Sequence, residues 1–543
     1  MRKESFLIKL FSFFCAALLL GGCTVSDIEQ SGEKEASFDF SQNISVDEDI
    51  SEDTSAPSDD THKPRISVDK TEFYANEAIN IYYENTDDKD WIGFYPEGAD
   101  PGSVNSITWK YSVGKGTASF NASDLGEPGT YWIFLCDNDG YQVLDILIIT
   151  LMDNDKTNYG AKSVSVSTEF SDGLSHISVT ITPGSAQEVT YRLYWSAENK
   201  RIDGYEPLFS ITHSGLEKFN VKLNDGIYMP ENADGIEVAV TKGASSSVFA
   251  SVPESLKLPD SKLLYKFNVI TDLHITPSRP QHTSHLSLAF EDIISFSESV
   301  AIFTCGDNTD KGTQEEYALL LETVEKAGNK LPDIYYALGN HDIVYNNNAG
   351  YSAQIKLFKN NLNMNAPYYS VVLNGNRFIV LGSDTLSATG TVGKEQLEWL
   401  KAELAKTEKN EPVFLFLHQP LIDTVSGSLY SLDSEIQDWY GVYDSADEIR
   451  EILKNYPNAF LFTGHTHWSL ESYQPVLLGR GKDANFVNCA SVGYLWNDLD
   501  TATGGSEGFY VEVYEDYILL RGREFIKGNW CAAAQFKIPL YKN

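Results

Sequence analysis

Basic residues are scarce in this sequence. Lys and Arg number 41 against 77 Asp and Glu, so the formal net charge is -36 at pH 7. A surface with this excess of acid repels polyanions at long range. Binding to nucleic acid without sequence preference depends on Lys and Arg that neutralise phosphates. We therefore do not expect a nucleic-acid polymer as a partner.

Long hydrophobic runs are also missing, and the apolar stretch near the N-terminus is short. It extends from Leu10 to Leu20 behind Arg2 and Lys3, whereas a transmembrane helix needs roughly 20 apolar residues. A basic start, a short apolar run and small residues after it are typical of an export signal. We predict a signal peptide over residues 1–22.

Leu20-Gly21-Gly22-Cys23 resembles the signal of bacterial lipoproteins. The resemblance implies cleavage before Cys23, lipidation of that cysteine and anchoring at the bacterial cell surface. The alternative is an ordinary secretory signal with an incidental cysteine. Residues 23–62 are rich in Asp, Glu and Ser and carry few apolar side chains. Such a segment cannot bury enough surface to fold, so we predict an acidic disordered tether.

Cysteine is scarce as well, with six in the chain. Cys15 lies in the predicted signal peptide, and Cys23 is the predicted lipidation site. The other four show neither C-x-x-C spacing nor a dense disulfide framework. These four are Cys136, Cys305, Cys489 and Cys531. Because all four lie in mostly apolar, strand-like contexts, we favour buried free thiols, with a disulfide in an exported protein as the alternative.

Two β-rich segments follow, over residues 63–151 and 162–258. Short alternating runs broken by Gly, Pro, Asn and Asp are typical of β-sandwiches. Asp90 to Pro96 and Trp109-Lys110-Tyr111 resemble the SKICH-type immunoglobulin-like module. For its aromatic side chains we favour core packing over a role in binding a ligand. The second segment resembles a fibronectin type III-like sandwich, for which we favour a spacer role.

Beyond Pro259 the pattern changes to strand-like runs that alternate with helix-like segments such as Gln314 to Ala327 and Lys394 to Lys406. This alternation indicates an α/β domain over residues 261–543. Five of the strand-like runs lead directly into polar clusters, and ligands collect at the carboxyl ends of strands in α/β sheets. The clusters are Asp272-Leu273-His274, Gly306-Asp307-Asn308-Thr309-Asp310, Gly339-Asn340-His341-Asp342, His418, and Gly464-His465-Thr466-His467. So many polar groups would be costly to bury unpaired, so we expect them to form one site.

The order D-x-H, G-D-x-x-D, G-N-H-D, H, G-H-x-H resembles the calcineurin-like metallophosphoesterase superfamily. The resemblance implies a four-layer α/β/β/α sandwich that binds two divalent metal ions. It assigns Asp272, His274, Asp307 and His467 to one ion. It assigns Asp307, Asn340, His418 and His465 to the other, so that Asp307 bridges them. Mixed imidazole and oxygen ligands suit Mn, Fe or Zn, and the ligands do not identify the metal.

The same resemblance implies roles in hydrolysis. Two cations bind phosphoryl oxygens and acidify a water to hydroxide, which attacks the phosphorus in line. His341 is not a metal ligand in the family pattern, so we expect it to protonate the leaving oxygen. Asp310 or Asp342 could orient its imidazole by accepting the other ring proton. We favour Asp310 by analogy with the family.

Departures from related families narrow the substrate. Asp310 stands where purple acid phosphatases carry a metal-binding Tyr, which argues against an Fe(III)-tyrosinate enzyme. Leu338 to Asp342 lacks the Arg with which serine/threonine phosphatases clamp a phosphomonoester dianion. Gly306 to Tyr317 also resembles the cyclic-nucleotide phosphodiesterase-like branch. These features favour phosphodiesters. His282, His285, Tyr494 and Trp496 could line a substrate cleft or serve only in packing, and we do not assign them to the site.

The sequence therefore predicts an exported, lipid-anchored phosphoesterase that hydrolyses small extracellular phosphoesters with two metal ions. One alternative is a phosphomonoesterase or nucleotidase on the same site. The other is a surface binding protein that acts through its β-sandwich modules. The sequence predicts no oligomeric state.

Overall fold

The computed structural model describes residues 63–542 except 100, 103, 154–156, 241, 244–246, 297, 347–349, 430–440, 443 and 499–500. The predicted signal peptide, the lipidation site Cys23 and the predicted tether lie outside these residues. Among the helices that are described, none combines the length and the apolar character needed to cross a membrane.

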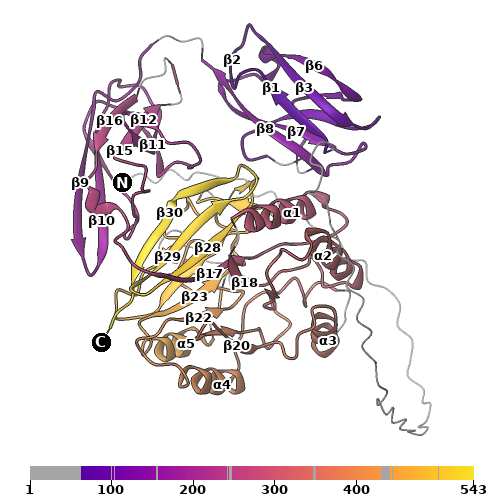
Figure 1. The fold of residues 1–543 in the computed structure, drawn as a ribbon, viewed down its shortest axis with the longest axis vertical. Helices are drawn as coiled ribbons and strands as arrows, with labels where there is room; N and C mark the ends of the chain where they lie inside the picture. Colours follow the sequence, from indigo (N-terminus) through magenta and orange to yellow (C-terminus); the bar gives the residue numbers. More distant parts are fainter. Residues whose placement is uncertain are drawn as a thin grey trace, which may run out of the picture. The chain divides into compact units, whose positions relative to one another are not determined.

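Two sheets form the segment that follows the predicted tether (indigo to violet in Figure 1). One has the strand order β1-β3-β6, and the other has the order β2-β8-β7-β4-β5. Alternate residues such as Ile79 and Ile81 point into the core between them, where the rings of Phe94 and Phe120 lie 4.7 Å apart. The strands are β1 (Arg65–Val68), β2 (Glu72–Tyr74), β3 (Ala78–Thr86), β4 (Trp91–Pro96), β5 (Thr108–Tyr111), β6 (Gly114–Asn121), β7 (Gly129–Cys136) and β8 (Val143–Met152).

The prediction of core packing is wrong for two aromatic side chains of this first module. Trp91 and Tyr95 are buried, but Trp109 is 51% exposed and Tyr111 is 50% exposed. Both belong to β5, which is the edge strand of the five-stranded sheet. An edge strand has no neighbour on its outer side, so its side chains are covered less than those of the central strands β4 and β7.

The second β-rich segment also contains two sheets. They have the orders β14-β10-β9 and β12-β11-β15-β16, with β13 paired to β11. Its core contains inward-facing residues such as Val179, Tyr191 and Trp195, which alternate with more exposed ones along each strand. The strands are β9 (Ser163–Ser171), β10 (Leu174–Thr182), β11 (Val189–Ala197), β12 (Lys200–Arg201), β13 (Phe209–His213), β14 (Phe219–Lys222), β15 (Gly235–Val240) and β16 (Ser247–Ser251).

Two six-stranded sheets build the C-terminal part. The first has the order β19-β18-β17-β28-β29-β30, in which β17, β18 and β19 run parallel. Its strands are β17 (Leu263–Ile270), β18 (Ser299–Thr304), β19 (Ile334–Tyr335), β28 (Glu507–Tyr514), β29 (Tyr517–Glu524) and β30 (Asn529–Pro539).

The second six-stranded sheet has the order β20-β21-β22-β23-β25-β24, in which β21, β22, β23 and β25 run parallel. Its strands are β20 (Tyr369–Leu373), β21 (Asn376–Val380), β22 (Val413–Phe416), β23 (Ala459–Thr463), β24 (Val476–Leu477) and β25 (Asn485–Asn488). A two-stranded sheet pairs β26 (Leu495–Trp496) with β27 (Ala502–Thr503).

Aromatic side chains fill the space between these two sheets. The Phe267 ring on β17 contacts the rings of Phe378 and Phe414 at 5.1 and 4.8 Å, and the Phe303 ring stacks on Phe416 at 4.3 Å. All of these side chains are fully buried. Burial of rings of this size is a large favourable term in folding, so the aromatic layer fixes the two sheets against each other.

Helices cover the outer faces of both sheets (Figure 1). Residues of α1, α2 and α3 pack against Ile270 and Ile302 of the first sheet, and those of α4 and α5 pack against the second. In α2 a capping box between Thr313 and Glu316 fixes the first turn. The helices are α1 (Pro280–Ser295), α2 (Gln314–Ala327), α3 (Tyr351–Asn361), α4 (Lys394–Leu404) and α5 (Ala446–Leu453).

Candidate metal centre

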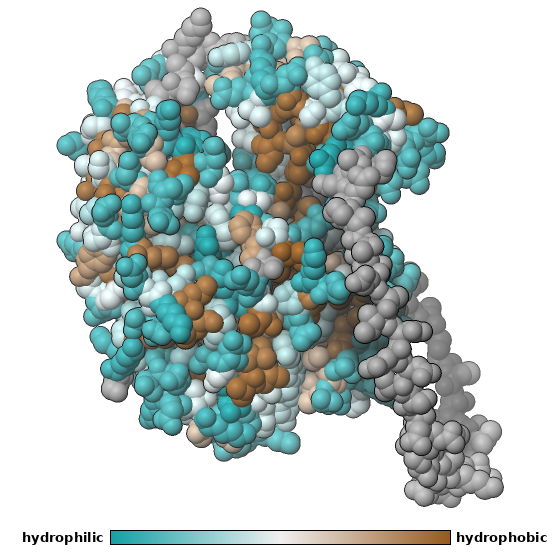
Figure 2. Space-filling model, in the orientation of Figure 1, coloured by the Kyte–Doolittle hydropathy of each residue, from teal (hydrophilic) through white to brown (hydrophobic). Residues whose placement is uncertain are grey.

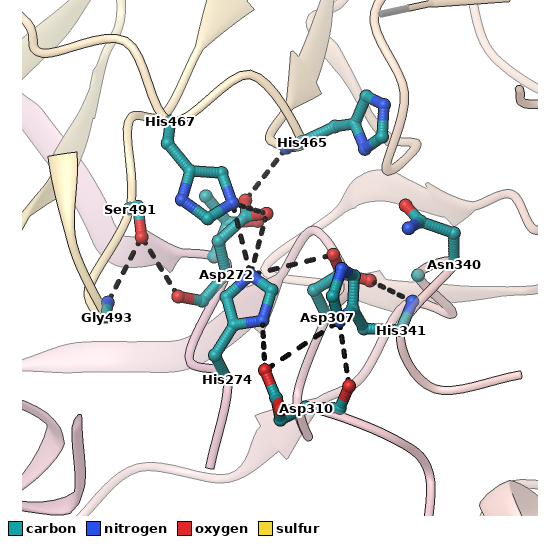
Figure 3. A network of polar contacts seen from close by, with 12 residues as sticks. Asp272, His274, Asp307, Asp310, Asn340, His341, His465, His467, Ser491 and Gly493 are labelled. Atoms are coloured by element: carbon teal, nitrogen blue, oxygen red, sulfur yellow. Dashed lines mark hydrogen bonds and ion pairs between the residues drawn. The ribbon is translucent and has the colours of Figure 1, made fainter. Parts of the chain in front are cut away.

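All nine residues predicted for metal binding and proton transfer come together in one place, at the carboxyl ends of β17, β18, β22 and β23 and in the loop after β19. They are Asp272, His274, Asp307, Asp310, Asn340, His341, His418, His465 and His467, and Figure 3 labels all of them except His418. Each of these strands is parallel to a neighbour in its sheet, so the segments that follow leave the same edge. The seven predicted metal ligands are all buried.

The first group of potential ligands contains Asp272, His274 and His467, whose ligand atoms lie within 4.8 Å of one another. Nε2 of His467 lies 2.9 Å from Oδ1 of Asp272 and 3.1 Å from Nε2 of His274. The Nδ1 of His467 donates a hydrogen bond to the backbone carbonyl of Tyr494, which turns Nε2 toward the group.

The second group contains Asp307, His418 and His465, again within 4.8 Å of one another. Nε2 of His418 lies 3.1 Å from Oδ2 of Asp307, 2.9 Å from Oδ1 of Asn340 and 3.2 Å from Nδ1 of His465. Asp307 also lies 3.7 Å from Nε2 of His274. Its carboxylate therefore contacts both groups, as the bridging role predicted for it requires.

The donor atoms of the second group fit a bound cation. Nδ1 of His418 donates to the carbonyl of Cys305, so a neutral ring has only a lone pair on Nε2. That lone pair would face the acceptor oxygens of Asp307 and Asn340, an arrangement that only a proton or a cation makes favourable. Burial alone would lower the pKa of His418, but the charges of Asp307 and Asp272 raise it to about 9. The site therefore attracts positive charge, and its oxygen and imidazole ligands suit a divalent transition metal.

The backbone at the ligands is strained. Asp272, His274, Asp307, His465 and His467 all have positive φ, between 45° and 70°. Non-glycine residues seldom adopt this left-handed region, which costs about 1–3 kcal/mol each. Several such residues at one site are stable only where the surrounding fold compensates.

Two motif glycines are required by close backbone approaches. A Cβ on Gly339 would lie 2.1 Å from Oδ1 of Asp307, and a Cβ on Gly464 would lie 2.1 Å from Oδ2 of Asp272. No side chain fits at such distances. The glycines of G-N-H-D and G-H-x-H thus allow these segments to pack directly on the two central carboxylates.

His341 is held by two hydrogen bonds. Its backbone N–H donates to Oδ1 of Asp307, and its Nδ1 donates to the backbone carbonyl of Asp310, each at 2.8 Å. Nε2 is therefore the ring nitrogen of His341 that can contact a substrate. Burial lowers the pKa of His341, and the Asp307 charge offsets part of that shift.

The carboxylate of Asp310 has other neighbours. Its Oδ1 lies 3.5 Å from Nδ1 of His274 and 3.7 Å from Nη1 of Arg279. Burial would raise the pKa of Asp310, but the hydrogen bond and charge of His274 and the Arg279 charge lower it to about 2. Asp310 therefore orients His341 through its backbone carbonyl, and its side chain supports His274.

Asp342, the other candidate for orienting His341, has a structural position. Its carboxylate accepts hydrogen bonds from the backbone N–H groups of Asn308, Thr309 and Gly339 and from two side chains. Burial raises its pKa to about 6. Asp342 links the segment that carries Asp307 to the segment that carries Asn340.

A cavity of about 180 Å³ lies at the two groups of potential ligands. Aromatic side chains line part of it. Tyr494 and Trp496, which the sequence left unassigned, both line it, and so do Tyr345 and Trp468. Sequence reasoning missed the last two and Arg279. Trp468 directly follows the ligand His467, and its ring stacks on that of Trp496 at 6.2 Å. Adjacency to a ligand was the only available signal.

His282 and His285 belong to the interior of the domain. Both are buried on α1, and their Nδ1 atoms donate to the carbonyls of His274 and Gly493. Burial lowers the pKa of His282 to about 3, so this ring is neutral. Both histidines position the backbone next to the site.

Comparison with known proteins identifies the domain that carries this site. Residues 265–469 match the calcineurin-like phosphoesterase family. This segment is a calcineurin-like metallophosphoesterase domain, and the match supports a hydrolase that acts on phosphoric esters.

Two individual proteins are similar to parts of the chain. A probable glycerophosphodiester phosphodiesterase of Arcobacter nitrofigilis is 29% identical over 174 residues, which cover 31% of this chain and 56% of that protein. The chain thus matches about half the length of this relative. A purple acid phosphatase from yellow lupin (Lupinus luteus) seeds is 12% identical over 88% of this chain and 96% of that one, with a TM-score of 0.38.

Proposed function

We propose that this chain is a binuclear metal-dependent phosphoesterase that hydrolyses small phosphoesters, with phosphodiesters preferred. The observation that carries the proposal is the pair of ligand groups with Asp307 in contact with both. A shared carboxylate can hold two cations about 3.5–4 Å apart, the spacing used for in-line displacement at phosphorus. The proposed architecture is a four-layer α/β/β/α sandwich, and the aromatic layer between the sheets and the helices outside them support it.

The residues that would bind the first ion are Asp272, His274, Asp307 and His467. Those for the second are Asp307, Asn340, His418 and His465. Two divalent cations there, Mn, Fe or Zn, would neutralise charge on phosphoryl oxygens and lower the pKa of a nearby water.

His341 is the residue that can hold and transfer a proton in this site. Its backbone N–H and its Nδ1 are already bonded to Asp307 and Asp310, so Nε2 is the atom that can carry the proton. Tyr345, beside it, has its ring centroid 4.4 Å from that of the imidazole. We assign His341 the protonation of the leaving oxygen, a role worth about 10²- to 10⁴-fold in rate.

The preference for diesters and for small substrates has two supports. The relative from Arcobacter nitrofigilis is named as a glycerophosphodiester phosphodiesterase. The cavity of about 180 Å³ is smaller than the roughly 300–1,000 Å³ of typical sites for drug-sized ligands. A small alcohol esterified to phosphate fits this limit better than a polymer does.

A phosphomonoesterase is the second candidate, because a positively charged side chain lies near the site. Arg279 is close to Asp310, and its side chain is 48% exposed. A guanidinium group here could compensate the extra charge of a monoester dianion. Steady-state kcat/KM for bis-p-nitrophenyl phosphate and p-nitrophenyl phosphate on the full chain separates the two. The diester should be the better substrate, and faster turnover of the monoester would favour the second candidate.

We propose further that the chain is exported and anchored to the bacterial cell surface through a lipid on Cys23, with residues 24–62 as a tether. The residue pattern at 20–23 supports this proposal. Palmitate labelling of cells that express the chain should label wild type and leave Cys23→Ala unlabelled. Equal labelling of both would exclude Cys23 as the attachment site.

For the two N-terminal modules, the SKICH-like and fibronectin type III-like identities are proposals that rest on their sequence patterns and two-sheet cores. The surface in Figure 2 is mostly hydrophilic, with hydrophobic residues in separate patches. A binding protein that acts through these modules remains the alternative for the whole chain.

A further inference from the structure

The first β-sandwich module carries a cavity that the proposed hydrolysis does not use. Its volume is about 360 Å³, within the range of small-molecule sites. The side chains that matter here are those of Trp91 on β4, Trp109 and Tyr111 on β5, and Tyr141 in the turn between β7 and β8. Asp139, from the same turn, also lines the cavity.

The rings stand nearly perpendicular to one another. Trp91 meets Trp109 at 78° and Tyr141 at 83°, with centroids 6.2 and 6.0 Å apart, and Trp109 meets Tyr111 at 88° and 5.2 Å. Because all four rings line one cavity, the perpendicular pairs form adjoining walls of it, and we call Trp91, Trp109, Tyr111 and Tyr141 the aromatic box. A sugar ring stacks best on a flat, open aromatic face, whereas a box presents several negative faces to one central group.

Three of these rings are exposed although they are large and apolar. Trp109 is 51%, Tyr111 50% and Tyr141 43% exposed. Val104 and Val113, on either side of β5, are exposed to a similar degree. Exposed apolar side chains that lie together often mark an interaction site, whereas single exposed ones scattered over a surface are normal.

Asp139 is the only charged residue that lines this cavity among the described residues. Oδ1 of Asp139 accepts a hydrogen bond from the Tyr111 hydroxyl at 2.7 Å, and its Oδ2 pairs with the exposed Lys89 at 2.8 Å. No Lys or Arg lines the cavity among the described residues. An exposed ion pair of this kind is weak and screened by salt, so the carboxylate remains available to a cation in the box.

We propose that this cavity binds a quaternary ammonium group, such as that of choline. Ring faces that carry negative charge attract such a cation within about 6 Å, and walls formed by several rings are the usual way to hold it. The methyl groups pack on the rings, and the positive charge is balanced by Asp139. The proposal does not depend on the activity of the metal centre.

The direct test is a titration of the full chain with choline, in which calorimetry and tryptophan fluorescence measure binding. The matched control ligand is 3,3-dimethyl-1-butanol, which has the same shape without the charge. Choline should bind saturably and the alcohol should not. Equal binding of the two, or binding of neither, would overturn the proposal, and so would binding of maltose in the absence of choline binding.

Variants locate the site. Trp109→Ala and Tyr141→Ala remove exposed rings and should each weaken choline binding roughly 2- to 30-fold. Tyr74→Ala, which removes a ring 44% exposed elsewhere in this module, should leave it unchanged. All three should give the wild-type circular dichroism spectrum, which shows that they fold. Unchanged choline affinity in Trp109→Ala and Tyr141→Ala would contradict the assignment.

Vesicles distinguish the two sources of the ligand. Sedimentation with phosphatidylcholine vesicles, but not with phosphatidylglycerol vesicles, together with competition by choline, would identify a lipid headgroup. Binding of free choline without sedimentation would identify a soluble ligand. Either result supports the proposal. Sedimentation with both vesicle types that choline does not reduce would contradict it.

Discussion

The Nδ1 of His341 donates a hydrogen bond to the backbone carbonyl of Asp310 at 2.8 Å, while the carboxylate of the same Asp310 lies 3.9 Å from that nitrogen. The carboxylate is closer to Nδ1 of His274, at 3.5 Å. Asp310 therefore has two separate roles. Its main chain orients His341, the proposed proton donor, and its side chain contacts His274, a proposed metal ligand.

Replacement of His341 tests the first role. His341→Ala should lower kcat about 10²- to 10⁴-fold, because the leaving oxygen loses its proton donor. The metal content should stay at the wild-type value, since none of the proposed ligands is removed. Elemental analysis beside steady-state kinetics checks both. Loss of bound metal in this variant would make His341 a ligand, a position its proximity to His274 and Asp307 also permits.

Replacement of Asp310 tests the second role. Asp310→Asn keeps the backbone carbonyl, so the orientation of His341 should persist. The support of His274 is weakened, and metal affinity should fall about 10- to 100-fold. Added Mn²⁺ should therefore restore most of the activity in Asp310→Asn and none in His341→Ala. A loss that saturating metal does not repair would place the Asp310 carboxylate in proton transfer.

Both proposed metal positions depend on Asp307. Asp307→Asn should reduce metal content and activity together, because an amide is a poorer ligand and lacks the charge that holds two cations close. Asp342→Asn is a useful comparison, since Asp342 is buried beside Asp307 but contacts mainly backbone N–H groups. It should mainly lower the melting temperature. Retention of two metals in Asp307→Asn would exclude the bridging role.

The buried carboxylate of Glu507 should make the stability of the folded chain depend on pH. Burial raises its pKa to about 8, although its carboxylate accepts a hydrogen bond from the backbone N–H of Leu470. The folded chain therefore binds a proton that the unfolded chain releases near pH 4.5, and stability falls as the pH rises from 4.5 to about 8. Glu507→Gln should flatten this slope and raise the melting temperature at pH 8 by roughly 2 °C or more.

Scanning calorimetry of both proteins between pH 5 and 9 measures the effect. The metal-free forms should be compared as well, so that changes in metal binding do not contribute. Parallel slopes for Glu507→Gln and wild type would mean that Glu507 is ionised in the folded protein at pH 7.

Much of the catalytic domain could be predicted from local sequence patterns. The helix expected over Gln314 to Ala327 has these bounds in the structure, and the strand-like runs before each polar cluster lie in or overlap β17, β18, β19, β22 and β23. The reason is physical, because a parallel strand buried on both faces is a continuous apolar run, and the residue type changes where the chain leaves the sheet. The convergence of the polar clusters followed from the same argument.

The features that could not be predicted depend on main-chain atoms and on which strands and loops lie next to one another. Sequence reasoning selected Asp310 but not its backbone carbonyl, because main-chain atoms carry no residue signature. It placed Trp109 and Tyr111 in a core, because the edge position of β5 depends on which strands pair. Tyr345 and Arg279 approach the site through the path of loops, and no motif marks them. The family resemblance implies the ligand roles, whereas the walls of the cavity depend on how the loops fold around it.

We propose that the buried groups around Asp307 hold two metal ions that the hydrolysis of phosphodiesters requires. The most direct measurement is the metal content of the purified chain together with its rate on bis-p-nitrophenyl phosphate, before chelation, after chelation and after Mn²⁺ is returned. We predict about two ions per chain, loss of the activity with the metal, and recovery when metal is added back. Full activity in the metal-free protein, or a fully loaded protein that hydrolyses no phosphoester, would contradict the account.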